Sequence, residues 1–277
     1  MSKFDVGVMQ GRLLPKYKGN YQAHPVNYWQ EEFPIASSLG LTCIEFILDF
    51  DGYEKNPLMT SVGINEINNI SKKNNVYVKS ICADFFMEAP LHSEVKEVSN
   101  KSKEVLITLI KNSKKIGVKN IVIPCVDKSS IKNEKDLDLF IKALRNITKQ
   151  VEHLDINLSL ETDLPPSKFS FLLKMIDSKI VKVNYDTGNS ASLGYDIKEE
   201  FAEYGNLISD IHIKDRLVNA GSVFFGTGDF NYHEFVKSFN TINYNGPIIM
   251  QVFRDDEGLE IFKKQFEIIN KQIINKI

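Results

Sequence analysis

Short runs of β-branched and apolar residues alternate with longer amphipathic stretches along the sequence. Eight of these runs have the pattern of strands: Phe4–Met9, Leu41–Leu48, Val76–Ala83, Asn120–Val126, Ile156–Thr162, Val181–Asp186, Ser209–Lys214 and Ile248–Phe253. Their first residues are about 35 residues apart on average. A strand, a helix and two short loops take about 30 to 40 residues, so each interval accommodates one βα unit.

Amphipathic patterns between the strands predict five helices: Glu94–Ile116, Asn133–Leu154, Asp196–Tyr204, Tyr232–Ile242 and Glu257–Ile277. Pro34 should kink the helix before Gly40 or mark its start. No repeat or linker interrupts the series. We therefore predict an α/β protein in which residues 1–277 form one domain, a single (β/α)8 TIM barrel with its active site at the carboxyl ends of the strands. A doubly wound open sheet is the alternative, although Gly7 and Gly11 do not form the dinucleotide-binding glycine motif.

Polar residues share one face in the fifth, sixth and seventh strands. The set comprises Asn157, Ser159 and Glu161, then Lys182, Asn184 and Asp186, and then Asp210, His212 and Lys214. Because side chains alternate along a strand, this face should line the barrel interior. Polar groups in such a position are costly unless they are paired or bind a ligand. The pattern therefore predicts a site where active sites of barrels are built.

Gln251 occupies the comparable position in the eighth strand, next to the positions of Glu161, Asp186 and His212. Two carboxylates, an imidazole and an amide oxygen suit one divalent metal ion, such as Mn²⁺, Co²⁺, Mg²⁺ or Zn²⁺. The alternative is a buried network of ion pairs and hydrogen bonds that includes Lys214.

Composition narrows the class of protein. The 277 residues are 43% apolar and 25% charged, with a net charge of −2. This excludes a disordered chain and a general nucleic-acid backbone binder. No apolar run approaches the ~20 residues of a membrane span, and the polar amino end lacks a secretory signal, so we expect a cytoplasmic protein with no membrane partner. Cys43, Cys82 and Cys125 lie in apolar runs without metal-binding spacing and are predicted to be buried.

Several motifs resemble those of the xylose isomerase-like TIM barrels. They are Met9-Gln-Gly-Arg-Leu-Leu-Pro, Leu39-Gly-Leu-Thr-Cys-Ile-Glu, Asp186-Thr-Gly-Asn, His212-Ile-Lys-Asp-Arg, Phe225-Gly-Thr-Gly-Asp-Phe and Tyr244-Asn-Gly-Pro. The resemblance covers nearly the whole chain. It is strongest for the sugar-phosphate isomerase and epimerase branch, which includes L-xylulose-5-phosphate 3-epimerase and hexulose-6-phosphate isomerases.

The resemblance implies that Glu161, Asp186, His212 and residue 251 bind one divalent metal ion. It also implies an isomerase or epimerase that moves a proton through an enediolate. The expected partner is a small sugar or sugar phosphate, no nucleic acid is expected to bind, and a homodimer is left open. Glu161 is the leading general base, and Lys214 is expected to stabilise an oxyanion or supply a second proton.

Residue 251 departs from the family pattern. Epimerases of this family carry a glutamate there that acts as one of two bases, whereas a glutamine cannot accept a proton at neutral pH. The departure leaves two alternatives to an epimerase open: a metal-dependent dehydratase of a cyclic polyol ketone, or a barrel that binds sugar without turnover. A DNA-repair endonuclease with this fold uses several additional histidines, whereas this chain has five in all.

Six further residues are predicted to bind substrate because they follow or close the strands: Arg12, Glu45, Asp84, His92, Arg216 and Arg254. The arginines, together with the loop Gly226-Thr-Gly228, are candidates for holding a phosphate group.

Overall fold

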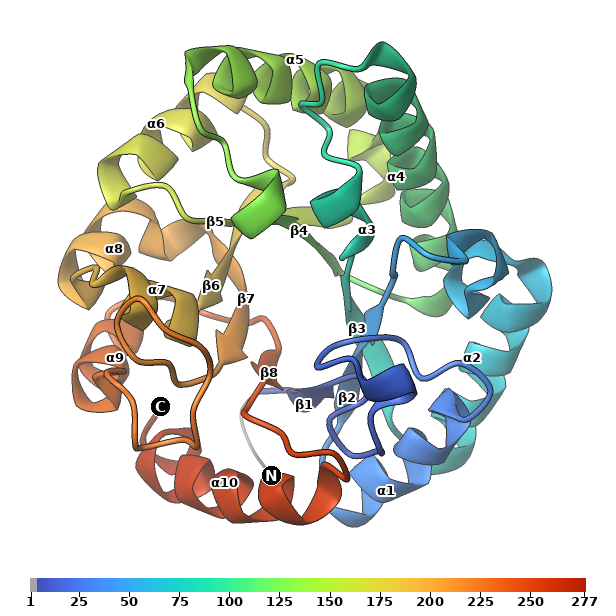
Figure 1. Ribbon diagram of the computed structural model, residues 1–277, viewed down its shortest axis with the longest axis vertical. Coiled ribbons are helices and arrows are strands. Elements are labelled where there is room, and N and C mark those ends of the chain that lie inside the picture. Colours follow the sequence, from blue (N-terminus) through green and yellow to red (C-terminus); the bar gives the residue numbers. More distant parts are fainter. Residues whose placement is uncertain (1–3) are drawn as a thin grey trace.

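Eight parallel strands close into a barrel in the computed structural model, which describes residues 4–277 (Figure 1). The strands are β1 Val6–Met9, β2 Cys43–Ile47, β3 Tyr77–Cys82, β4 Asn120–Cys125, β5 Asn157–Thr162, β6 Val181–Asp186, β7 Ile208–Ile213 and β8 Ile248–Met250. Each strand pairs with its neighbour in the sequence, and β1 pairs with β8. The predicted TIM barrel is confirmed, and the open sheet is excluded. Residues 1–3 of the polar amino end lie outside the described residues.

The strand register brings the predicted interior residues to one end of the barrel. Asp186 of β6 lies opposite His212 of β7, and Glu161 of β5 lies opposite Pro124 of β4. Strand β8 is shorter than the sequence predicts, because it ends at Met250. Gln251 follows it directly, and its backbone N–H still donates to the Ile213 carbonyl at 3.0 Å. Its side chain therefore keeps a fixed place beside β7.

Helices surround the barrel as an outer ring (Figure 1). The helices are α1 Glu32–Ser38, α2 Ser61–Asn74, α3 Phe85–Glu88, α4 Lys96–Ile116, α5 Glu134–Val151, α6 Pro166–Ile176, α7 Thr187–Leu193, α8 Ile197–Tyr204, α9 Tyr232–Phe239 and α10 Leu259–Gln272. The short α3 and α7 lie inside the ring, directly after β3 and β6 (Figure 1). The five helices predicted from periodicity are present with shorter ends. Asn133 and Asp196 serve as N-caps of α5 and α8, because their side chains accept backbone hydrogen bonds just before each helix begins. Pro34 lies in the first turn of α1, which it leaves intact.

Apolar side chains pack in two places. The main core lies between the strands and the helices, and a smaller cluster comprises Met9, Cys43, Ile47, Cys82, Val122 and Ile249. Burying a side chain of this size contributes about 1.5–3 kcal/mol. The cysteine prediction is confirmed, since Cys43, Cys82 and Cys125 are buried and free. Among residues 4–277, no helix is long and apolar enough to cross a membrane.

Two arginines join the loops that follow the first and the last strand. Arg254 donates to the carbonyls of Gly11 and Leu14, both at 2.7 Å. In the other direction, Nε of Arg12 donates to the Val252 carbonyl at 3.1 Å. Both arginines are buried, with exposed fractions of 1% for Arg12 and 3% for Arg254. These contacts fix the seam where the barrel closes.

Candidate metal centre

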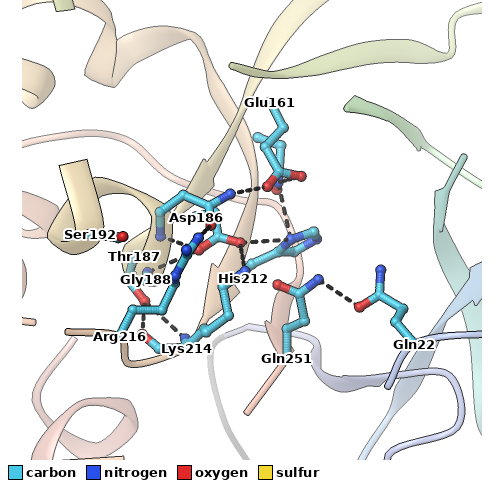
Figure 2. A network of polar contacts seen from close by, with 12 residues as sticks. Gln22, Glu161, Asp186, Thr187, Gly188, Ser192, His212, Lys214, Arg216 and Gln251 are labelled. Carbon is cyan, nitrogen blue, oxygen red and sulfur yellow. Dashed lines mark hydrogen bonds and ion pairs between the residues drawn. The ribbon is translucent and has the colours of Figure 1, made fainter. Parts of the chain in front are cut away.

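Glu161, Asp186 and His212 converge at the carboxyl ends of β5, β6 and β7 (Figure 2). One ligand atom from each lies within 4.8 Å of those from the other two. The three side chains are buried, with exposed fractions of 6%, 5% and 0%. Three of the four residues predicted to bind a metal therefore form one cluster.

Asp186 has two carboxylate oxygens with separate partners. Oδ1 accepts hydrogen bonds from the backbone N–H groups of Gly188 and Asn189, both at 2.9 Å, and so caps the start of α7. Oδ2 lies 2.8 Å from Nζ of Lys214 and 3.7 Å from Nδ1 of His212. Burial favours a higher pKa for Asp186, but the charge of Lys214 and the contacts with His212 outweigh it, and its pKa is lowered. Asp186 is thus an ionised carboxylate, and its Oδ2 faces Lys214 and His212.

A glycine is required where α7 begins. A Cβ atom at residue 188 would lie 2.8 Å from Cγ of Lys214. The Asp-Thr-Gly-Asn motif therefore serves packing as well as capping, because its glycine lets the Lys214 stem pass over α7.

Glu161 is held by two amide side chains. Nδ2 of Asn189 donates to its Oε1 at 2.5 Å, and Nδ2 of Asn184 donates to its Oε2 at 3.4 Å. Asn189 is itself oriented by Arg216, whose Nη1 donates to its Oδ1 at 2.8 Å. Burial, with a smaller contribution from the charge of Asp186, raises the pKa of Glu161 to about 7. A carboxyl group with this pKa can both take and return a proton near neutral pH.

His212 lies between the cluster and a second carboxylate. Its Nε2 is 2.7 Å from Oε1 of Glu45, and both side chains are completely buried. Oε2 of Glu45 accepts a hydrogen bond from Ser80. Burial acts to lower the pKa of His212, but the charge of Glu45 and the hydrogen bonds to Asp186 and Glu45 raise it. Asp210 lies near this contact. One of its carboxylate oxygens, a carboxylate oxygen of Glu45 and a ring nitrogen of His212 all lie within 4.8 Å of one another.

Gln251 presents its carbonyl oxygen to the site because its amide nitrogen is used elsewhere. Nε2 donates to Oε1 of Gln22 at 3.0 Å, and Nη2 of Arg12 donates to the same oxygen at 3.0 Å. Nε2 of Gln22 donates to Oδ2 of Asp84 at 2.8 Å. Arginine has only donors, so Gln22 must face it with oxygen, and Gln251 must then face Gln22 with its NH₂ group. Figure 2 shows Gln22 and Gln251 on one side of His212 and Asp186 on the other.

These residues fit a divalent cation. Oε1 of Gln251 is buried and has no hydrogen-bond partner among residues 4–277. Together with Asp186 Oδ2, His212 Nδ1 and the Glu161 carboxylate, it forms a set of oxygen and nitrogen donors. A buried oxygen without a partner, such as that of Gln251, is costly unless something binds it, and Mn²⁺, Co²⁺, Mg²⁺ and Zn²⁺ accept ligands of these types.

The candidate phosphate-binding groups are largely occupied. All three guanidinium nitrogens of Arg254 donate to backbone carbonyls. Two of those of Arg12 donate to backbone carbonyls, and the third donates to the side-chain oxygen of Gln22. The backbone N–H groups of Gly226 and Gly228 donate to the Asp215 carboxylate. Arg216 uses Nε for the Ala220 carbonyl and Nη1 for Asn189. Its Nη2 has no hydrogen-bond partner among residues 4–277, so Arg216 is the arginine best placed to contact an anion.

A cleft of about 980 Å³ is joined to the cluster through Gln22, which lines it and contacts Gln251, whereas the four candidate ligands do not line it. Its walls come from the loops that follow β1 to β4, and Gln22 and Asp84 are among the lining residues. His92 is not among them: it is buried and packs edge-on against the ring of Phe140. Sequence reasoning missed two residues that hold the cluster, Gln22 and Asn189. The position of Asn189 in the Asp-Thr-Gly-Asn motif was a usable signal, whereas Gln22 had none.

Known proteins share this architecture. A curated relative from Haemophilus influenzae, "Putative L-ribulose-5-phosphate 3-epimerase SgbU", is 23% identical over 98% of this chain and 97% of its own length. The IolI protein, solved with a bound zinc atom, has a TM-score of 0.78 at 14% identity and covers 100% of this chain and 99% of its own. D-psicose 3-epimerase from Clostridium cellulolyticum, solved with D-tagatose, has a TM-score of 0.73 at 18% identity and covers 95% of this chain and 89% of its own.

The family described as "Xylose isomerase-like TIM barrel" matches residues 33–272, which include the four candidate metal ligands and most of the barrel. The resemblance seen in the sequence motifs is confirmed by this match, and the chain belongs to the xylose isomerase-like TIM barrel family.

Proposed function

We propose that this chain is a divalent-metal-dependent epimerase or isomerase of a sugar or sugar phosphate. The whole barrel acts as one domain, with its active site at the carboxyl ends of the strands. The observation that carries the proposal is the convergence of Glu161, Asp186 and His212 with the unpartnered carbonyl oxygen of Gln251. The relative from Haemophilus influenzae and D-psicose 3-epimerase, both named as epimerases, support it.

The chemistry is a proton transfer next to a carbonyl group. A divalent ion held by Glu161, Asp186, His212 and Gln251 would polarise the carbonyl of a ketose and a neighbouring hydroxyl. Glu161 would then take the proton from the adjacent carbon as the general base. Lys214 keeps Asp186 ionised and supplies positive charge at the rim of the site.

A phosphate group on the substrate is supported by the name of the curated relative and by Arg216. If Arg216 binds the phosphate, Arg216→Gln should raise KM more for L-ribulose 5-phosphate than for L-ribulose. Equal effects on the two sugars would instead assign Arg216 only to the orientation of Asn189 and Glu161.

Metal content and solvent exchange test the function together. The purified protein should contain about one divalent ion per chain, measured by elemental analysis. In D₂O it should exchange the carbon-bound proton next to the carbonyl of L-ribulose 5-phosphate, L-ribulose, D-psicose or D-tagatose. Glu161→Gln should abolish epimerisation, while Glu88→Gln on the cleft rim should not. Turnover by Glu161→Gln at the wild-type rate would remove Glu161 as the base.

Gln251 favours one competing function, a barrel that binds sugar without turnover. That protein would bind metal and one of these sugars but exchange no proton. A dehydratase would exchange the proton and also release water from a cyclic polyol ketone.

A further inference from the structure

An epimerase needs two groups on different sides of the reacting carbon, one to remove a proton and one to deliver it. Glu161 can serve as one of them. Residue 251 cannot serve as the other, because an amide is neither a base nor an acid at neutral pH and its nitrogen donates to Gln22. The second group must come from another wall of the site.

The cleft beside the metal cluster limits the candidates. Lys214 is held by Asp186 at 2.8 Å, on the side of His212 away from Gln22 (Figure 2). Glu45 is completely buried, and its Oε1 is taken by Nε2 of His212 at 2.7 Å. Asp84 does line it, at the end of β3, and it is joined to the site through Gln22.

His24 and Asp49 also line the cleft, and neither is joined to the metal cluster. Nδ1 of His24 contacts Oε1 of Gln10 at 3.0 Å, and burial lowers the pKa of His24 to about 4. Asp49 accepts the backbone N–H of His24 at 2.8 Å. Asp84 differs from both, because Gln22 joins it directly to Gln251 at the metal cluster.

Glu161 and Asp84 are held by the same kind of contact chain. Arg216 donates to the oxygen of Asn189, whose NH₂ group donates to Oε1 of Glu161 at 2.5 Å. On the other wall, Arg12 donates to the oxygen of Gln22, whose NH₂ group donates to Oδ2 of Asp84 at 2.8 Å. In each chain the arginine, which has only donors, decides which end of the amide meets the acid. Both carboxyl groups are thus held in a fixed direction.

The second oxygen of Asp84 is also engaged, since Oδ1 accepts a hydrogen bond from Sγ of Cys82 at 3.1 Å. Burial raises the pKa of Asp84, and the hydrogen bonds from Gln22 and Cys82 offset this only in part. A raised pKa favours the protonated acid, which is the form that delivers a proton.

Resting on the proposed function, we propose that Asp84 is the second proton-transferring group of this site, so that the reaction inverts a carbon next to the carbonyl. The carboxylate of Glu161 takes the proton, the C–H electron pair forms the enediolate double bond, and the carbonyl pair moves to oxygen. Asp84 then delivers its proton to the opposite face of the same carbon, and the carbonyl group re-forms. Glu161 ends protonated and Asp84 ionised, and exchange with water resets both groups.

Solvent exchange from each epimer separately tests this assignment. Two pairs of C3 epimers serve as probes, L-ribulose 5-phosphate with L-xylulose 5-phosphate and D-psicose with D-fructose. The metal-loaded enzyme is placed in D₂O, and NMR follows both epimerisation and loss of the C3 proton. In Asp84→Asn, epimerisation should fall at least ~100-fold while exchange continues from one epimer only. In Glu161→Gln, exchange should continue only from the other epimer.

Two further variants keep the result interpretable. Asp84→Glu retains a carboxyl group and should therefore epimerise faster than Asp84→Asn. Asp51→Asn, at an exposed acid of the same cleft, should behave as wild type. Epimerisation by Asp84→Asn within a few-fold of wild type would overturn the proposal, as would loss of exchange from both epimers with metal content unchanged. If the wild type exchanges neither epimer of either pair, the proposed function itself is wrong and this inference falls with it.

Discussion

Nε2 of His212 lies 2.7 Å from Oε1 of Glu45, and neither side chain is exposed. The contact leaves Nδ1 of His212 as the ring atom that faces Asp186. A carboxylate that accepts the outer N–H of a ligating histidine fixes the tautomer and direction of the ring. Glu45 was predicted to bind substrate, but its position indicates that it orients His212, which is a candidate metal ligand.

Glu45→Gln should weaken metal binding by about 10 to 100-fold, because the ring loses the carboxylate that orients it. Competition with a coloured chelator measures the metal Kd without any need for turnover. Glu88→Gln, at an exposed glutamate of the cleft rim, is the matched control and should leave the Kd unchanged. An unchanged Kd in Glu45→Gln would show that the ring is held by its packing alone.

Removing the metal should destabilise the fold, because Glu161 and Asp186 would then lie close together without a cation between them. Free metal at about 1,000 times its Kd stabilises the bound state by about 4 kcal/mol. Thermal unfolding with and without EDTA should therefore show a lower Tm in the chelator. His212→Asn, which lacks one ligand, should lose most of this difference. An equal Tm with and without EDTA in the wild type would contradict the metal site.

Gln251→Glu should not create a faster epimerase, although it restores the residue usual in the family. The new carboxylate would face the Gln22 oxygen that Arg12 holds in place, so two acceptors would meet at a buried contact. Such a mismatch costs about 1–3 kcal/mol. Urea unfolding should show the loss, and the epimerisation rate should not rise. A faster enzyme of unchanged stability would show that Gln22 reorients freely.

Buried His24 should make stability depend on pH. Burial lowers its pKa from 6.5 to about 4, so between these values the unfolded chain binds more protons than the folded one. The contribution of His24 to the free energy of unfolding is therefore fully present above pH 6.5. It falls as the pH drops toward 4, by about 1.4 kcal/mol per pH unit and roughly 3 kcal/mol in all.

His24→Phe should flatten this dependence, because the ring packing against Phe46 is kept and the titrating group is removed. Urea unfolding at pH 7 and pH 4.5 measures it. His153→Gln removes an exposed histidine and should keep the wild-type slope. Parallel slopes for wild type and His24→Phe would show that other groups cause the pH effect.

The barrel and three of the candidate metal ligands could be predicted, because the strands and the positions of these residues depend on local sequence patterns. Alternation placed Glu161, Asp186 and His212 on the interior face, and parallel strands bring such residues to one end. The role of Gln22 was hidden, since it lies in a loop without periodicity and acts only through Arg12 and Asp84, which approach from separate loops.

Two other features were not predicted correctly from the sequence, because they too depend on tertiary contacts. Helix α7 was not predicted, because Thr187-Gly-Asn-Ser has low helix propensity and the helix depends on the Asp186 cap. The charge of Arg254 suggested an anion partner. Its donors go to backbone carbonyls of a loop that is distant in the sequence, and no composition or motif reveals such a pairing.

The seam formed by Arg12 and Arg254 also bears on how the protein is made. During synthesis, the β1 edge and the carbonyls of Gly11 and Leu14 leave the ribosome about 240 residues before their partners. Until then that strand edge is open to wrong pairing, which is a hazard of slow parallel sheets. Gln251 is in the same late segment, so the nascent chain can complete the proposed metal site only when the barrel closes.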